Sequence, residues 1–176
     1  MIIENIYGKR VFLRKVKKSD ADILCRWKND TYFKKMALDE DSIITLSNQQ
    51  QDIEKAQQDK NQLYYIIHHK QKDQPIGYIR INWINIKNKI AWLRFGLGDL
   101  RKQGYGEESL RIFFNYWFEN SLHRAEAEVF EYNLPSVKLL TKLNFKREGE
   151  KRKAHFYQGK YYDVILFGLL KEDILG

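Results

Sequence analysis

The sequence predicts a mixed α/β (α+β) fold in which helices flank a single, mostly antiparallel β-sheet. The first observation is a set of three neighbouring segments rich in Ile, Tyr, Phe and Trp and joined by short polar turns: residues 62–70, 75–86 and 89–98. Such segments are typical of an antiparallel meander. The second is an apolar stripe at helical spacing directly after the meander: Leu110, Phe113, Phe114, Trp117 and Phe118. The third is a C-terminal pair of strand-like segments, 145–157 and 161–170, whose joining residues predict a hairpin.

The N-terminal part of the chain predicts one strand and one helix. Residues 10–16 alternate in the manner of a first strand, and residues 18–30 follow as a helix. Ser19 is the expected N-cap of that helix. Ile23 and Trp27 lie four residues apart and are expected to define its buried face.

The remaining elements complete an order of β-α-α-β-β-β-α-β-α-β-β. Residues 47–60 predict a polar helix, capped by Ser47, with few apolar anchors and therefore a surface position. Residues 123–130 alternate small apolar with charged side chains, as expected of a strand covered on one face. Pro135 suits the first turn of a short helix over residues 135–143.

Composition limits the classes of protein to which the chain can belong. Its 176 residues, of which 43% are hydrophobic, favour one folded domain spanning residues 1–176. Cys25 is the single cysteine, which excludes an intrachain disulfide and a multi-cysteine metal site, and we expect no metal. The start of the chain does not read as a signal peptide and no run is long enough to span a membrane, so a cytoplasmic location is predicted. The net charge of +8 favours an anionic partner.

Two glycines lie between the meander and the striped helix. The stretch Arg101-Lys-Gln-Gly104-Tyr-Gly106 precedes the helix, where unpaired amides and the helix dipole attract anions. Glycines leave the backbone bare, so the motif predicts a phosphate cradle. The alternative is a tight turn that needs glycine only for its backbone conformation.

The same stretch resembles the acetyl-CoA motif of the GCN5-related N-acetyltransferases (GNAT). Resemblance to the RimJ/RimL-like members extends along nearly the whole chain, and the "YNLPSVKLLTKLNF" segment and the "F-x-x-G-x-x-x-D" hairpin are its most specific parts. It implies an acyl-CoA N-acyltransferase fold with a centrally splayed sheet. It also implies direct acetyl transfer from acetyl-CoA, as co-substrate, to a primary amine in a ternary complex.

The resemblance implies a set of cofactor-binding residues. Those of the cradle are Arg101, Lys102, Gln103, Gly104, Tyr105 and Gly106. The strand before it, around Phe95, Gly96 and Leu97, supplies the oxyanion-stabilising amide, with a bulge for which Gly96 and Gly98 are permissive; the alternative is that these glycines only relieve crowding. Asn133 contacts the cofactor arm or caps the next helix, and Ser136 contacts the cofactor.

His155 and Ser136 are the candidate catalytic residues. Family members use a serine to protonate the departing thiolate, and Ser136 matches it; the alternative is a local backbone contact. RimL-like members have a glutamate base where this chain has His155, and histidine is suited to proton transfer near neutral pH. The tyrosine acid of other relatives is replaced by Leu140, and an early strand glutamate by Trp92. These departures leave a second hypothesis open, a catalytically degraded acetyl-CoA sensor or interaction module.

The acceptor amine is not fixed by these residues. The resemblance allows a ribosomal-protein or other peptide N-terminus, an amino sugar or another small amine, and the positive charge disfavours polyamines. We expect no membrane partner, and the chain lacks a nucleic-acid recognition signature. A basic run in the last helix and hairpin is read as a solvated face or as an anion-attracting surface. The sequence is compatible with a homodimer but does not determine the oligomeric state.

Overall fold

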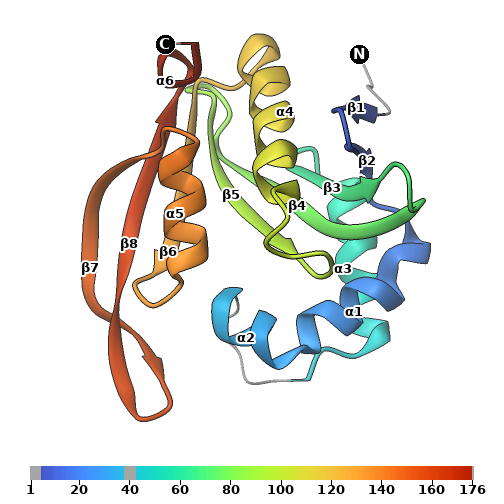
Figure 1. Cartoon of the computed structure of the whole chain (residues 1–176), viewed down its shortest axis with the longest axis horizontal. Coiled ribbons are helices and arrows are strands. Elements are labelled where there is room, and N and C mark those ends of the chain that lie inside the picture. The colour runs from blue at the N-terminus through green and yellow to red at the C-terminus, as the bar shows by residue number, and fades with distance from the viewer. Residues whose placement is uncertain (1–4, 38–42, 176) are drawn as a thin grey trace.

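A computed structural model describes residues 5–37 and 43–175 and contains an eight-stranded sheet (Figure 1). Its strands are β1 Asn5–Tyr7, β2 Val11–Lys15, β3 Gln62–His69, β4 Gln74–Asn85, β5 Ile90–Leu97, β6 Arg124–Phe130, β7 Lys146–Tyr157 and β8 Lys160–Leu170. They lie in the order β1-β2-β3-β4-β5-β6-β8-β7, and each neighbouring pair is antiparallel except β5 and β6. The predicted meander and closing hairpin are confirmed.

Helices cover both faces of this sheet. They are α1 Ala21–Asn29, preceded by the 3₁₀ turn η1 Lys18–Asp20, then α2 Thr31–Ala37, α3 Leu46–Gln58, α4 Tyr105–Asn120, α5 Leu134–Lys142 and α6 Lys171–Leu175. In Figure 1, α4 and α5 lie in front of the sheet. α3 passes behind β4, and α1 lies below the strands at the lower right. The sequence predicted none of β1, α2 and α6, which are short and carry no clear periodicity.

The larger hydrophobic core lies between α4 and the sheet. Leu110, Phe113 and Phe114 of the predicted stripe are fully buried there, together with Leu140 of α5. Complete burial of one such side chain contributes about 1.5–3 kcal/mol. This packing fixes the direction of α4, and therefore the position of its N-terminus relative to β5.

The smaller core lies beneath α1 and α3 and corrects two predictions. Ser19 is not the cap of α1, because it lies inside η1; the Asp20 carboxylate instead accepts the Lys17 amide at 2.7 Å and is paired with Arg14. The cap of α3 is Thr45, whose hydroxyl accepts the Asn48 amide at 3.1 Å, and not Ser47. On the predicted buried face, Trp27 is buried and Ile23 is only half-buried.

The sheet is splayed at its centre, as the family resemblance implied. β5 and β6 pair only from Ile90↔Arg124 to Trp92↔Glu126. Beyond these residues β5 stays paired with β4 as far as Leu97, while β6 stays paired with β8 as far as Phe130. An opening therefore separates the ends of the two central strands.

The predicted bulge does not lie at Gly96. The β4–β5 register continues without a shift from Gly77↔Leu97 to Trp83↔Ala91. At the end of the strand, the amides of Gly98 and Asp99 both donate to the Ile76 carbonyl, at 2.9 and 3.1 Å, which is the two-to-one pattern of a bulge. Both glycines also admit aromatic rings: a Cβ on Gly96 would lie 2.5 Å from the Phe33 ring, and a Cβ on Gly98 would lie 2.2 Å from the Trp27 ring. Both residues thus relieve crowding, the alternative weighed above.

Substitution Gly98→Ala should destabilise the protein by about 1–3 kcal/mol, the usual cost of overpacking. The added methyl would force Trp27 from its place, where its indole N–H donates to Asp99 at 2.9 Å. Gly149→Ala is the matched strand control, because its new Cβ would lie 3.9 Å from the nearest atom outside its immediate neighbours. Urea unfolding of both variants provides the measurement, and equal stability of the two would refute this account of Gly98.

Candidate functional site

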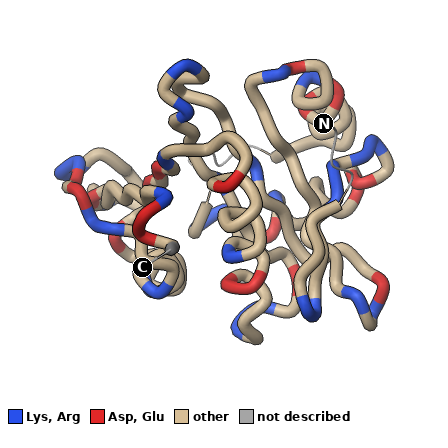
Figure 2. The backbone as a smooth tube through the Cα atoms, turned by 90° about the horizontal axis from the view of Figure 1, so that it is seen from above, with Lys and Arg blue, Asp and Glu red and all other residues tan. Residues whose placement is uncertain are grey.

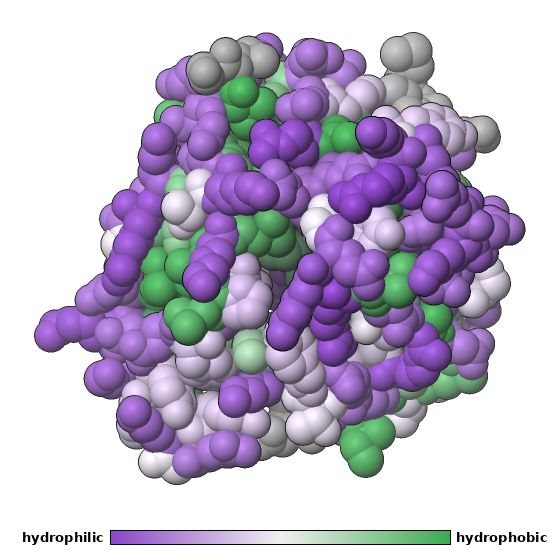
Figure 3. Space-filling view, viewed as in Figure 1, coloured by the Kyte–Doolittle hydropathy of each residue, from purple (hydrophilic) through white to green (hydrophobic). Residues whose placement is uncertain are grey.

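A cavity of about 720 Å³ occupies the opening between β5 and β6. Its walls come from α1, α2, β4, β5, the start of α4, β6, α5 and β7. In the space-filling view, hydrophobic surface gathers beside α5 and is bordered by hydrophilic side chains (Figure 3). Lys28 of α1 and Tyr32, Phe33 and Met36 of α2 also line the cavity.

The loop before α4 adopts the conformation of a cradle. Leu100, Lys102 and Gly104 have positive φ angles of 51°, 63° and 81°. Gly104 is the N-cap of α4 and, having no side chain, makes no capping hydrogen bond to the first turn; no other side chain within residues 5–37 and 43–175 is seen to replace it. The leading amides of α4 are thus left for an external acceptor, and the dipole of this 16-residue helix favours an anion there.

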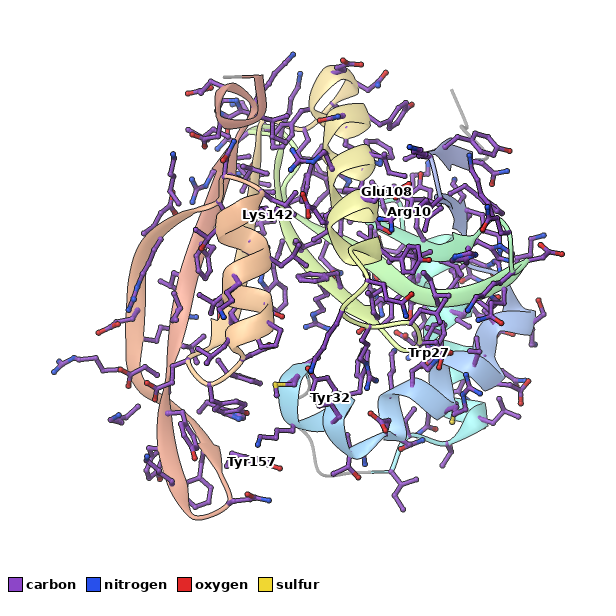
Figure 4. The ribbon with its side chains drawn as sticks, in the orientation of Figure 1. Arg10, Trp27, Tyr32, Glu108, Lys142 and Tyr157 are labelled. Carbon is purple, nitrogen blue, oxygen red and sulfur yellow. The ribbon has the colours of Figure 1, made fainter. Side chains whose placement is uncertain are left out.

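Arg10 supports the cradle from the β1–β2 turn. Its Nη1 donates to the Gln103 carbonyl at 3.0 Å, and its guanidinium lies 4.6 Å from the centre of the Tyr105 ring. Its Nε pairs with Glu108 of α4 at 2.7 Å, and Figure 4 shows these two residues side by side. Burial raises the pKa of Glu108, but hydrogen bonds from Arg10 and Val11 outweigh it, so the net shift is downward.

The two cations of the motif have different environments. Arg101 Nε donates to the Leu97 carbonyl at 2.8 Å, its Nη2 reaches Asp30 at 3.2 Å, and the guanidinium lies over Tyr32. Lys102 is exposed and has no ion pair among the residues that the structure describes. Both line the cavity, whereas Gln103 and Tyr105 do not. Tyr105 is buried, with its hydroxyl 2.9 Å from His69 Nε2.

Main-chain amides of β5 face the opening. Gly98 donates its N–H to the Ile76 carbonyl at 2.9 Å, so that cross-strand pair is hydrogen-bonded. Because hydrogen-bonded and non-hydrogen-bonded pairs alternate in an antiparallel ladder, the N–H groups of Phe95 and Leu97 point away from β4. They lie beyond Trp92, the last β5 residue that pairs with β6, and therefore border the cavity.

Asn133 and Ser136 line the opposite wall of the cavity. The Asn133 side chain accepts the Ser136 amide at 3.2 Å, which is the N-cap contact weighed as an alternative, and donates to the Met36 carbonyl at 2.8 Å. Asn133 thus joins the start of α5 to α2 across the opening. Ser136 is half-buried beside it.

His155 is buried in the cavity wall and stacks on Phe130, with ring centres 3.7 Å apart. Its Nε2 lies 3.0 Å from the Tyr132 hydroxyl, which donates to the Lys35 carbonyl at 2.8 Å. A phenol has one hydrogen to donate. Nε2 of His155 must therefore donate to Tyr132, so a neutral His155 carries its lone pair on Nδ1.

Comparison with known proteins identifies the family. The model of the acetyltransferase (GNAT) domain matches residues 10–146. The chain belongs to the GNAT family. It is 32% identical to the uncharacterized N-acetyltransferase p20 of Bacillus licheniformis, over 99% of this chain and 100% of the relative. The family relationship makes the chain an acyltransferase.

Solved structures share the fold of this GNAT chain. A RimL ribosomal L7/L12 N-terminal acetyltransferase in complex with CoA has a TM-score of 0.83, with 19% identity over 95% of this chain and 98% of that one. Spermidine N-acetyltransferase of Vibrio cholerae, with CoA and spermine, has a TM-score of 0.88, with 18% identity over 96% of this chain and 100% of that one.

Sequence reasoning missed a group of cations that line the cavity of this GNAT chain. Lys28 of α1, Arg80 of β4 and Arg94 of β5 come from three separate elements. In the sequence, each appears as an ordinary polar position of an amphipathic element. Only the pairing of Arg80 with Arg94 across β4 and β5 brings these charges together.

The basic run in the last helix and hairpin is interspersed with acidic residues (Figure 2). Lys142, Lys151 and Lys153 pair with Glu107, Glu128 and Asp163, at 2.6, 2.6 and 3.2 Å. This pairing agrees with the solvated-face alternative. Within the described ranges, no helix is long and apolar enough to span a membrane, and no group of three potential ligands could hold a metal ion.

Substitution Gly104→Ala should weaken binding of CoA at least tenfold. The left-handed φ of 81° and a Cβ 3.3 Å from Arg10 Nη2 would both disturb the cradle. Gly159→Ala is a matched control, because φ is 79° there and no atom lies within 4 Å of the added Cβ. Both variants should lose about 1–2 kcal/mol of stability from backbone strain. Calorimetric titration with CoA separates them, and unchanged affinity in Gly104→Ala would contradict the cradle.

Proposed function

We propose that this protein transfers an acetyl group from acetyl-CoA directly to a primary amine while both substrates are bound. The observation that carries the proposal is the opening between β5 and β6, which connects the amides before α4 with a second, differently lined half of the same cavity. One substrate can enter from each half. The name of p20 and the CoA complexes among the solved structures support this reading.

The residues of the chain fit acetyl-CoA, whose thioester supplies the activated acyl group. The cradle from Arg101 to Gly106 would hold the diphosphate through backbone amides, with Lys102 as an additional cation. The opening would admit the pantetheine arm, and Asn133 and Ser136 border its path. The resemblance implies that Asn133 contacts the pantetheine arm. To do so, its side-chain amide would release the Met36 carbonyl and donate to the arm instead.

The amides of Phe95 and Leu97 are the candidates for stabilising charge on the acyl oxygen. They are held by a regular strand, so no reorganisation is needed when negative charge develops. Fixed donors of this kind commonly contribute several kcal/mol to the lowering of an activation barrier. Gly96 keeps the neighbouring surface of the strand bare except for the Phe33 ring.

His155 and Ser136 are proposed for the two proton transfers. His155 would take the proton of the attacking amine at Nδ1, because Nε2 is committed to Tyr132. Ser136 would return a proton to the departing thiolate from the first turn of α5. Tyr132 then acts as a positioning residue, since it orients the imidazole and is anchored on Lys35 of α2.

The acceptor and its setting stay proposals. The solved relatives act on a ribosomal protein N-terminus or on spermidine, according to their titles, and a peptide N-terminus or a small amine fits this cavity. Membership of the RimJ/RimL-like subfamily, a cytoplasmic location and a homodimer are further expectations from the sequence. The alternative function is an acetyl-CoA sensor, favoured by Trp92 and Leu140 at positions where relatives carry acidic or hydroxyl groups.

Substitution His155→Ala should lower kcat by about 10²–10⁴-fold, the usual contribution of a general base, and leave the CoA dissociation constant within threefold. Thiol release from acetyl-CoA with a panel of primary amines provides the rate. His123→Ala is the control, since His123 is exposed and is not among the residues that line the cavity.

The same assay distinguishes the two functions. An enzyme releases thiol with at least one amine, whereas a sensor binds CoA tightly and releases none with any amine. Turnover in His155→Ala within threefold of the parent protein would remove the base assignment and leave the acetyltransferase proposal in place.

A further inference from the structure

Three cations line the part of the cavity formed by α1, β4 and β5. Lys28 and Arg80 have side chains that are only 11% and 12% exposed, whereas Arg94, directly opposite Arg80 on the same face of the sheet, is exposed at the cavity surface. Asp52 of α3 is shared by two of them: it lies 2.9 Å from Arg80 Nη1 and 3.6 Å from Lys28 Nζ. Among residues 5–37 and 43–175, no carboxylate pairs with Arg94.

This arrangement leaves an excess of positive charge inside the cavity. Arg80 and Arg94 are directly opposed in the β4–β5 register, where like charges are destabilising. Burial lowers the pKa of Lys28, Asp52 opposes this shift, and Arg80 and Arg94 add to it. The two buried cations, Lys28 and Arg80, share one carboxylate, and buried cations are costly without a full counter-charge. A bound anion would therefore stabilise the cluster, and Arg94 is accessible to contact it.

Aromatic rings position the cations without neutralising them. Lys28 lies 5.7 Å from the centre of the Tyr78 ring, Arg80 lies 4.8 Å from that of Tyr64, and Arg94 lies 4.4 Å from that of Trp92. These ring faces are therefore already occupied by the protein's own cations. A cationic substrate such as a polyamine would meet both repulsion and occupied rings here.

We propose that Lys28, Arg80 and Arg94 bind an anionic group of the acceptor, so that the substrate is a small amine that also carries a carboxylate or a phosphate. This inference rests on the proposed function and specifies its substrate class. Arg94 precedes Gly96 by two residues on one strand face, which separates their Cα atoms by about 7 Å. The Arg94 guanidinium lies over Trp92, which precedes it on the strand, and not toward Gly96, so a short chain of several bonds separates the acidic group from the amino group that is acetylated.

The test compares matched amines that differ only in the acidic group. β-Alanine and β-alaninamide form the carboxylate pair, 2-aminoethyl phosphate and 2-aminoethanol form the phosphate pair, and spermidine represents polyamines. In at least one pair, the anionic amine should have a kcat/KM at least tenfold higher than that of its neutral partner, as measured by thiol release. The pair that shows the preference identifies carboxylate or phosphate as the recognised group.

Variant proteins connect the preference to the cluster. Arg94→Gln should reduce the anionic-to-neutral ratio to within threefold of unity, whereas Arg152→Gln, which removes the same charge outside the cavity lining, should preserve it. Calorimetric binding of the anionic amines to the protein–CoA complex gives a second readout. It should weaken at least tenfold in Arg94→Gln and stay unchanged in Arg152→Gln.

The outcomes separate this inference from the proposed function. Thiol release without preference for either anionic amine, a preference for spermidine, or a preference that survives Arg94→Gln would overturn the inference and leave the acetyltransferase in place. Arg94-dependent binding of an anionic amine without thiol release would support the inference and overturn the enzyme. Absence of both binding and turnover would overturn both.

Discussion

The early end of the β5–β6 pairing is the constraint on which the site depends. β5 is held to β4, and β6 to β8, along nearly their whole lengths, so each central strand is committed to its outer neighbour. Among the described strands, the two halves of the sheet pair with each other only over residues 90–92 of β5. Past that point the ladder of β5 has one unpaired edge. An edge that would elsewhere invite aggregation here lies inside a cavity, where its amides are available to a substrate.

The position of the cradle follows from the same geometry and from the N-terminal strands. Because the stripe of α4 is buried against the sheet, the start of the helix is fixed at the end of β5. Arg10 then connects the β1–β2 turn to Gln103 and Glu108. These residues lie about one hundred positions from Arg10 in the chain, and their contacts with it stabilise the loop. The backbone strain of Leu100 and Lys102 is tolerated because both ends of the loop are held, and Gly104 adopts its positive φ without strain. An anion-binding loop with this support is organised before its ligand arrives.

The sequence predicted the elements in which apolar side chains repeat at regular spacing. It did not predict features that depend on contacts between residues far apart in the chain. The meander, the α4 stripe and the closing hairpin were right because burial on one face imposes a period on the residues. Ser19 and Ser47 were plausible caps, but Asp20 and Thr45 lie where the backbone actually turns. A bulge was assigned to Gly96 and Gly98 but lies only at the second. The rings that these glycines admit, Phe33 and Trp27, lie far away in the chain. The glycine motif located the cradle, but nothing in the sequence aligned Arg80 with Arg94.

The two halves of the cavity recognise their ligands by different means, and this has a consequence for specificity. The cradle and the β5 edge present main-chain amides, which substitutions of side chains leave largely unchanged. The other half presents Lys28, Arg80, Arg94 and Trp92, whose chemistry depends entirely on side chains from α1, β4 and β5. Acceptor preference can therefore change by substitution in these three elements while the geometry of the acyl-donor half is preserved. A fold shared with relatives that act on a protein N-terminus or on spermidine is compatible with this division. In the proposed function, the splayed strands would determine where transfer occurs, and the side chains beyond them would determine which amine is presented.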